Sequence, residues 1–290
     1  MHGFSTRIGL PEQKGKSRRA APAGLDLGTH AARQPHTVLE NRRKFFGELG
    51  AEDFAVASLQ QIHSAEVWQV QSGPAGNLEY RAAGYRLPPD ARRTEHAGDA
   101  LLTSQPSILL TVRAADCLPV LLVDPKQRVI AAVHAGWRGL LRRVVEKTVG
   151  EMRRIFGCEP RNLFAALGPS IRGCCYEVGP EVVDAFRGRF PRAGRFFHKS
   201  TQLASAPQEI GFLSMMPPGH GPPAGSGLNL DLTGVAIDQL ESAGLRKSRV
   251  QTADFCTACR NDLFFSYRKE GNSAGRMMAV IGLRAPSTNN

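Results

Sequence analysis

The sequence predicts an α+β fold, a single domain in which mixed β-sheets are flanked by helices in a layered α/β sandwich. Short runs rich in β-branched residues form hairpin-like pairs, of which LPVLLVD and VIAAVHA around the turn PKQR are the clearest. Helical patterns lie between these runs without the regular strand–helix alternation of a doubly wound fold. With 290 residues, 42% of them hydrophobic, the chain can bury one large core.

The spacing of apolar residues predicts the elements in order. Residues 36–50 have helical spacing with Gly50 placed to end the helix, and residues 54–70 contain two strands separated by the polar step QQIHS. A strand follows at 108–113, then the hairpin, then one helix over 139–157. The remaining expectations are a strand running into a loop at 162–170, helices at 180–190 and 231–244, and a final strand at 276–283. We treat residues 1–290 as one domain with a flexible insertion at 207–227, where MMPPGHGPPAGSG is the most loop-like stretch.

A cysteine and a histidine lie at the open end of the predicted hairpin. A turn centred between Pro125 and Lys126 places Cys117 directly opposite His134, with Cβ atoms roughly 5 Å apart. Each residue alone fits a buried core position, but the opposed pair indicates a metal site or a catalytic pair.

A catalytic zinc needs a third protein ligand and one open position. His63 and His96 are the upstream candidates. His63 is favoured, because the polar QQIHS step between two strands can carry a ligand to the open end of a sheet. A set of two histidines and one cysteine suits zinc, which accepts mixed nitrogen and sulfur ligands.

Composition restricts the class of partner. The formal net charge is +11, and the basic clusters have no interleaved aromatic residues of the kind that stack nucleic-acid bases. We therefore expect a pocket for an anionic small molecule and no nucleic-acid partner. The chain has no apolar run long enough to span a bilayer and no secretion signal at its start, so a cytoplasmic protein without a membrane partner is expected.

The six cysteines are expected to be thiols or metal ligands. Cys256 and Cys259 form a CxxC motif, but neither a second cysteine pair nor closely spaced histidines follow it. We therefore expect this motif to be neither a zinc site nor a redox site.

Several motifs in a fixed order resemble those of one known family. HGFSTR, QIHSAEV, GDALLT, RAADCLPVLLVD, VHAGWRG, GPSIRGCCYEVG and FFSYRKEGNSAGRMMAVIGL together cover essentially the whole chain. They are similar to the laccase-domain family, which was once named multicopper polyphenol oxidase and is now described as purine nucleoside phosphorylases. The insertion at 207–227 departs from the family pattern and leaves these motifs intact.

The resemblance implies a site and an activity. It puts the metal ligands and catalytic residues on His63, Cys117 and His134, with zinc as the metal and copper as the alternative. It implies phosphorolysis of adenosine, inosine and methylthioadenosine to the base and a ribose 1-phosphate, together with deamination of adenosine. The implied partners are purine nucleosides and phosphate, and the oligomeric state stays open.

Three residues are candidates for binding the substrate anion. Arg138 follows His134 by four residues, where the chain turns into a helix, and a helix N-terminus beside a guanidinium is a good phosphate site. The glycine-flanked loop GPSIRG offers Ser170 and Arg172 as further donors. A solvated surface position is the competing interpretation for both arginines.

Three other functions compete with phosphorolysis. A multicopper oxidase needs many closely paired histidines, and the chain has eight histidines and no HxH. A metal-free hydrolase would use Cys117 as a nucleophile activated by His134, and the family has also been linked to editing of peptidoglycan precursors. In the third, the cluster only stabilises the fold and binds zinc through a fourth protein ligand.

Overall fold

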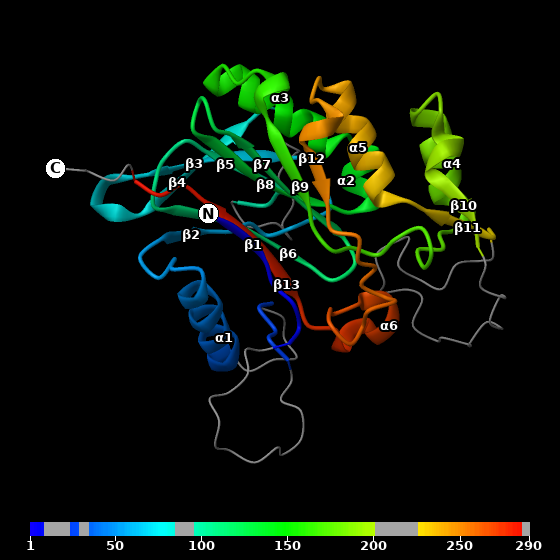
Figure 1. Ribbon diagram of the computed structural model, residues 1–290, viewed down its shortest axis with the longest axis horizontal. Helices are drawn as coiled ribbons and strands as arrows, with labels where there is room; N and C mark the ends of the chain where they lie inside the picture. Colours follow the sequence, from blue (N-terminus) through cyan, green and yellow to red (C-terminus); the bar gives the residue numbers. More distant parts are fainter. Residues whose placement is uncertain (9–23, 29–34, 85–95, 201–225, 286–290) are drawn as a thin grey trace, which may run out of the picture.

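The computed structural model describes residues 1–8, 24–28, 35–84, 96–200 and 226–285, which form four stacked layers (Figure 1). A seven-stranded sheet and a four-stranded sheet lie face to face, and each has helices on its outer face. The predicted α+β fold with mixed sheets flanked by helices is confirmed. Residues 207–225 of the predicted insertion lie outside the described residues.

The seven-stranded sheet contains the predicted hairpin at its centre. Its strands in spatial order are β12 (Val250–Thr252), β9 (Phe164–Leu167), β7 (Leu118–Asp124), β8 (Val129–Ala135), β5 (Ala100–Thr103), β3 (Val67–Ser72) and β4 (Leu78–Ala83). β7 is antiparallel to both β8 and β9, whereas β3 and β5, like β9 and β12, run parallel. The sheet is therefore mixed.

The four-stranded sheet brings the two ends of the chain together. Its strands in order are β1 (His2–Phe4), β13 (Met277–Gly282), β6 (Ile108–Ala114) and β2 (Ala55–Ala57). Leu101 and Ile130 of the larger sheet pack in one cluster with Val112 and Ile281 of the smaller sheet. Burial of these apolar side chains between the sheets holds the two layers together.

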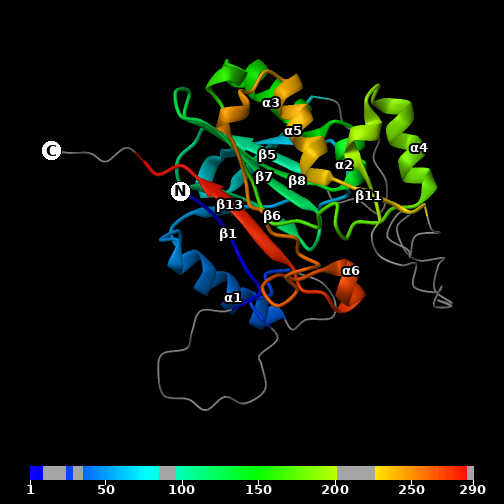
Figure 2. The ribbon, with the colours of Figure 1, turned by 45° about the vertical axis from the view of Figure 1, so that its right-hand side comes forward.

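Helices cover the two outer faces (Figures 1 and 2). The larger sheet is covered by α3 (Val144–Phe156) and α5 (Leu232–Ser242), with α4 (Pro180–Arg189) to one side, and the smaller by α1 (Pro35–Glu48). The remaining elements are the short helices α2 (Trp137–Leu141) and α6 (Tyr267–Glu270) and the strand pair β10 (Phe197–Lys199) and β11 (Leu228–Leu230). In the described part of the chain, no helix has the length and apolar character needed to cross a membrane.

The prediction of a single helix over residues 139–157 is wrong, because the structure has two helices there. α2 ends at Leu141, and Arg143 has a φ of 63°, a left-handed conformation that typically ends a helix. The Arg143 side chain lies over the ring of Phe190 and forms an ion pair with Glu146, and both contacts hold the break. The break separates the short helix after His134 from α3, whose Val145, Val149 and Met152 pack against the sheet.

The predicted hairpin register is also wrong, by two residues. Pro119, not Cys117, lies opposite His134, and Asp124 pairs with Val129, so four residues make the turn. The Asp124 carboxylate accepts hydrogen bonds from the backbone N–H groups of residues 126 and 127, which favours this longer turn. Side chains two residues apart on a strand face the same side. Cys117 therefore stays on the same side as His134, as a diagonal neighbour just before β7.

Two connections between the sheets carry the other two predicted metal ligands, His63 and Cys117. The chain leaves β2 in the smaller sheet and enters β3 in the larger one, and His63 lies in this connection. It crosses again from β6 to β7, and Cys117 ends that connection. Both crossovers meet the end of β8 where His134 lies, which brings three distant parts of the sequence to one place.

Candidate metal centre and its pocket

The three predicted ligands, His63, Cys117 and His134, come together in the structure. We call these three residues the trio. Each offers one ligand atom, and the three atoms lie within 4.8 Å of one another. The Cys117 sulfur is 3.6 Å from His63 Nε2, and the two imidazole rings meet edge-on with centroids 4.9 Å apart. A tetrahedral zinc ion with bonds of about 2.0–2.3 Å holds its ligand atoms roughly 3.3–3.8 Å apart. The donor set therefore fits one metal ion with a coordination position left open.

A buried carboxylate holds His63 in place. The φ of His63 is 56°, in the left-handed region that side chains other than glycine rarely adopt. Backbone N–H groups of Ile62, His63 and Ser64 all donate to the carboxylate of Asp99, and the Ser64 hydroxyl adds a further bond of 2.7 Å. These bonds stabilise the strained turn, because several N–H groups converge on one anion.

The same carboxylate orients His134. Asp99 Oδ1 lies 2.8 Å from His134 Nδ1, and both side chains are buried. Because this bond engages Nδ1, Nε2 is the ring nitrogen left to hold a metal ion, as in many metal-binding histidines. Asp99 was not predicted as a site residue; the one signal in the sequence is an aspartate directly before an apolar strand, in GDALLT.

Gly136 explains part of the HAGWRG string. A Cβ atom at this position would lie 2.8 Å from His63 Cδ2 and 3.1 Å from the Cys117 sulfur. Its backbone is extended, so close approach to the trio, not an unusual φ, requires glycine here.

Charges in the trio favour the thiolate that a metal ligand requires. Burial raises the pKa of a thiol, but the neighbouring His134 and His63 outweigh it and lower the pKa of Cys117 to about 5. Burial lowers the pKa of an imidazole, yet the Cys117 sulfur and the Asp99 carboxylate raise the pKa of His134 to about 10. In the metal-free protein these directions favour a thiolate beside an imidazolium, and a metal ion that binds His134 would replace its Nε2 proton.

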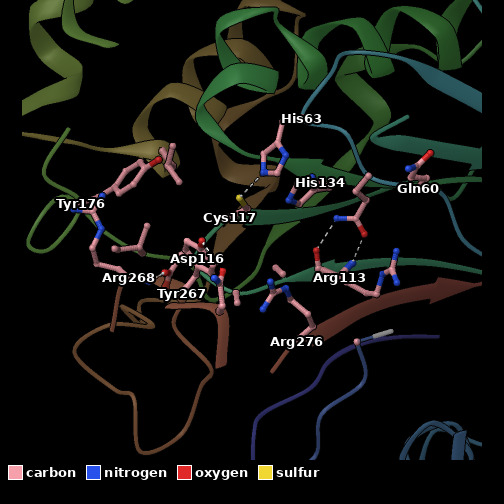
Figure 3. Close-up of a pocket in the computed structure, with 17 residues that line it drawn as sticks. Gln60, His63, Arg113, Asp116, Cys117, His134, Tyr176, Tyr267, Arg268 and Arg276 are labelled. Atoms are coloured by element: carbon pink, nitrogen blue, oxygen red, sulfur yellow. Dashed lines mark hydrogen bonds between the residues drawn. The ribbon is translucent and has the colours of Figure 1, made fainter. Parts of the chain in front are cut away.

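The trio lies in the wall of a cavity of about 480 Å³, a size that suits a nucleoside-sized ligand. In Figure 3 the trio lies between Tyr176 and Arg268 on one side and Arg113 and Arg276 on the other. The aromatic rings of Tyr176 and Tyr267 line the cavity. Aromatic faces of this kind can stack on a flat base.

Three arginines make the cavity wall positive. Among the residues that the structure describes, the lining contains Arg113, Arg268 and Arg276 and only one carboxylate, that of Asp116. Burial lowers the pKa of Arg113, and the positive charges of Arg42 and Arg276 lower it further. An anion bound between Arg113 and Arg276 would relieve this repulsion, so the electrostatics of the pair favour an anionic ligand.

Asp116 connects the metal trio to the opposite wall. Its φ is 85°, a strained value for a residue other than glycine, and it immediately precedes Cys117. One carboxylate oxygen accepts from the Thr257 hydroxyl at 2.6 Å and the other from the backbone N–H of Arg268 at 2.6 Å. The carboxylate thus ties Cys117 to the segment that carries Arg268.

The three predicted substrate-binding residues are not among those that line the cavity. The Arg138 guanidinium lies over the ring of Trp137, at 4.4 Å from its centroid. Ser170 is buried, and Arg172 donates to the backbone oxygen of Ala253 and pairs with Asp254. The alternative ligand His96 stacks on the ring of Tyr80, away from the trio.

Arg113, Arg268 and Arg276 were not predicted as site residues. Arg268 and Arg276 belong to the FFSYRKEGNSAGRMMAVIGL motif, where their charge alone did not distinguish them from surface arginines. Only the packing of β6 and β13 in one sheet brings Arg113 and Arg276 to the same cavity.

A second cluster lies elsewhere in the described structure. The sulfur atoms of Cys174, Cys175, Cys256 and Cys259 all lie within 4.8 Å of one another. The premise that the CxxC motif has no second cysteine pair is therefore wrong. The second pair precedes the motif by about 80 residues, too far for a motif search based on local spacing.

Comparisons with known proteins agree with the fold and with the resemblance read from the motifs. A purine nucleoside phosphorylase of Deinococcus radiodurans is 35% identical over 285 residues, 97% of this chain and 88% of that protein. The purine nucleoside phosphorylase YlmD of Geobacillus stearothermophilus is 28% identical over 95% of this chain and 89% of its own. The crystal structure of the hypothetical protein YfiH from Bacillus licheniformis superposes with a TM-score of 0.73 at 26% identity, covering 98% of this chain and 92% of that one. The family model for multi-copper polyphenol oxidoreductase laccase matches residues 1–284, and the chain belongs to this family.

Proposed function

We propose that the protein is a zinc-dependent purine nucleoside phosphorylase. It would cleave adenosine, inosine and methylthioadenosine to the base and the corresponding ribose 1-phosphate, and would also deaminate adenosine. The observation that carries the proposal is the joining of an open metal trio, an arginine pair and aromatic rings in one cavity of about 480 Å³. The names of the relatives support the same reaction.

The reaction needs an anion next to the sugar. In phosphorolysis a phosphate oxygen bonds to C1′, the bond from C1′ to the base nitrogen breaks, and the base leaves with the electron pair and takes up a proton. Arg113 and Arg276 would hold the phosphate, because two guanidinium groups neutralise its charge and donate several hydrogen bonds. Zinc held by the trio would supply a Lewis acid at the edge of the same cavity.

The remaining lining residues would hold the nucleoside. The rings of Tyr176 and Tyr267 offer faces for the base, and base–aromatic stacking contributes about 1–3 kcal/mol per base. The Tyr267 hydroxyl donates to Asn272 Oδ1, which fixes the ring and the amide together. Arg268 donates to the backbone oxygen of Glu177 and lies over the Tyr176 ring, so it stiffens that wall.

Phosphate dependence tests the proposal. Zinc-loaded protein is incubated with adenosine, with and without phosphate, and the products are separated by chromatography. We expect ribose 1-phosphate only when phosphate is present, in an amount equal to adenine and hypoxanthine together. Without phosphate, we expect inosine from deamination and no free base. Inosine and methylthioadenosine as substrates then establish the preferred nucleoside. Adenine formed at the same rate without phosphate would contradict phosphorolysis.

One observation favours a second candidate. The pKa of Cys117, lowered to about 5 by its histidine neighbours against the effect of burial, also suits a nucleophilic thiolate. A metal-free amide hydrolase acting on peptidoglycan precursors would use this pair. Metal dependence distinguishes the two functions. Removal of the metal by a chelator would abolish phosphorolysis and would leave a cysteine hydrolase active. A polyphenol oxidase with copper in place of zinc is the third and weaker candidate. The trio can hold only one ion, whereas a multicopper oxidase needs several.

A further inference from the structure

Four cysteines from two distant loops meet at one point of the described structure. Cys174 and Cys175 lie in the loop between β9 and α4, and Cys256 and Cys259 lie in the loop after β12. The Cys259 sulfur is 3.3 Å from that of Cys175 and 3.6 Å from that of Cys174. None of the four lines the cavity beside the metal trio.

Backbone hydrogen bonds fix the two loops around the sulfurs. The N–H of Thr257, inside the CxxC motif, donates to the oxygen of Ser170, so the two loops run side by side at that motif. The N–H of Arg260 donates to the oxygen of Cys256, which closes a tight turn around the CxxC motif. The N–H of Cys175 donates to the oxygen of Arg172, which closes a similar turn around the other pair.

The geometry suits one tetrahedral ion. Four thiolates bound to zinc at about 2.3 Å have their sulfurs roughly 3.8 Å apart, close to the distances seen here. A disulfide needs sulfurs at about 2.05 Å, and none of these four cysteines forms one in the structure. A CxxC motif in a tight turn, as at Cys256 and Cys259, is typical of closed structural zinc sites. The adjacent residues Cys174 and Cys175 supply the other two sulfurs.

We propose that four cysteines, Cys174, Cys175, Cys256 and Cys259, bind a second zinc ion as four thiolates. We call these four residues the quartet. Each cysteine that is still protonated releases its thiol proton to solvent as the ion binds, and no electron transfer is involved. With four protein ligands the site is closed, so it acts on structure and not on substrate.

The site would stabilise one wall of the cavity. Thr257, inside the CxxC motif, donates to Asp116, the residue before the ligand Cys117. Tyr176 follows Cys175 directly and lines the cavity. An ion that ties these two loops together therefore holds Tyr176 and Asp116 at fixed positions relative to the metal trio.

Zinc content of the full chain tests the proposal without an activity measurement. Protein purified under reducing conditions is loaded with zinc, passed over a weak chelating resin and analysed for zinc per chain. Wild type is expected to retain about two ions, Cys117→Ala about one, and Cys256→Ser/Cys259→Ser about one. Cys158→Ala is the matched control, because Cys158 lies outside both clusters, and it is expected to retain about two.

Cobalt identifies which cluster holds the remaining ion. Cobalt-loaded Cys117→Ala is expected to show intense thiolate-to-cobalt absorption of a tetrahedral site, and the Cys256→Ser/Cys259→Ser variant is expected to lose most of it. If the double variant does not fold, Cys174→Ser changes an exposed member alone and is expected to release zinc to a chelator faster than Cys158→Ala does. A zinc-free Cys117→Ala protein after loading would overturn the proposal. The proposal would also be overturned if two of the four cysteines resisted alkylation until a reductant was added, because those two would then form a disulfide.

Discussion

The two thiol clusters of this protein differ in what surrounds the sulfur. Cys117 lies between two imidazoles, one of them hydrogen-bonded to the buried carboxylate of Asp99, and its pKa falls to about 5. Cys174 lies among other thiols near the surface, and burial together with those thiols raises its pKa to about 11. One sulfur is charged before a metal ion arrives, and the other acquires its charge only as an ion replaces its proton.

This difference indicates a division of roles. A prearranged trio lines a cavity, and a metal ion held by its three side chains would have one position open for chemistry. The proposed quartet site joins two loops through four protein ligands and would leave no position open. Changes at the trio are therefore expected to remove activity, whereas changes at the quartet are expected to loosen the fold around it.

The largest effect is expected from loss of the trio cysteine. In Cys117→Ala, zinc at this site falls from about one ion per chain to a small fraction, because two ligands bind weakly, and phosphorolysis falls to background. Cys256→Ser/Cys259→Ser is expected to keep activity within about tenfold, a change of about 1.4 kcal/mol in the barrier. Adenine release and zinc content are measured together. Equal losses of activity in the two variants would remove the proposed division of roles.

The next largest effect is expected at the arginine pair. Loss of a charge-assisted contact to phosphate in Arg276→Ala costs roughly 2–4 kcal/mol, which is about a 30- to 1000-fold loss in kcat/KM for phosphate. Arg138→Ala is compared in parallel, because Arg138 follows the ligand His134 in the sequence but lies outside the cavity lining. The rate of adenine release, measured at increasing phosphate concentrations, distinguishes the two variants. A larger loss in Arg138→Ala would place the phosphate at the start of α2.

A smaller effect is expected at Asp99. Asp99→Asn removes the anion that orients His134 and holds the His63 turn, so zinc affinity at the trio should fall about 10- to 100-fold. Ser64→Ala removes one hydrogen bond to that carboxylate and leaves the charge, so it serves as the milder control. Competition with a chelator of known affinity measures both. Unchanged zinc affinity in Asp99→Asn would show that the carboxylate only supports the fold.

The smallest effect is expected in thiol reactivity. In metal-free protein the Cys117 thiolate forms as pH rises through about 5, so its alkylation by iodoacetamide should reach a plateau below pH 7. Cys174, with its pKa raised to about 11, should react appreciably only at alkaline pH. The advantage of Cys117 over an ordinary thiol at pH 6 is only roughly tenfold, because a thiolate of low pKa is a weaker nucleophile. Peptide mapping by mass spectrometry gives both profiles; half-maximal alkylation of Cys117 near pH 8.5 would contradict the lowered pKa.

The sequence predicted the trio in spite of a wrong register. An error of two residues keeps Cys117 and His134 on the same side of the hairpin, whereas an error of one would have separated them. His63 was chosen over His96 because a polar step between two strands leads to the end of a sheet, and the structure places it there. The layered α+β fold was predictable for a similar reason, since local spacing of apolar residues determines most strands and helices.

The rest of the site depends on contacts between distant segments. The quartet joins residues more than 80 positions apart, and no local spacing indicates that two loops will meet. Asp99 and Arg276 have ordinary residue types in apolar surroundings, and their roles follow from the packing of sheets around the trio. The break at Arg143 was hidden because the apolar residues keep a helical spacing across it.

Anomalous scattering at the zinc absorption edge, from crystals of the zinc-loaded full chain, tests the central claim most directly. The account predicts one peak bound by His63, Cys117 and His134, with its fourth position facing the cavity, and a second peak enclosed by the four cysteines. Zinc found only in the quartet, or a fourth protein side chain completing the trio, would contradict a catalytic metal centre.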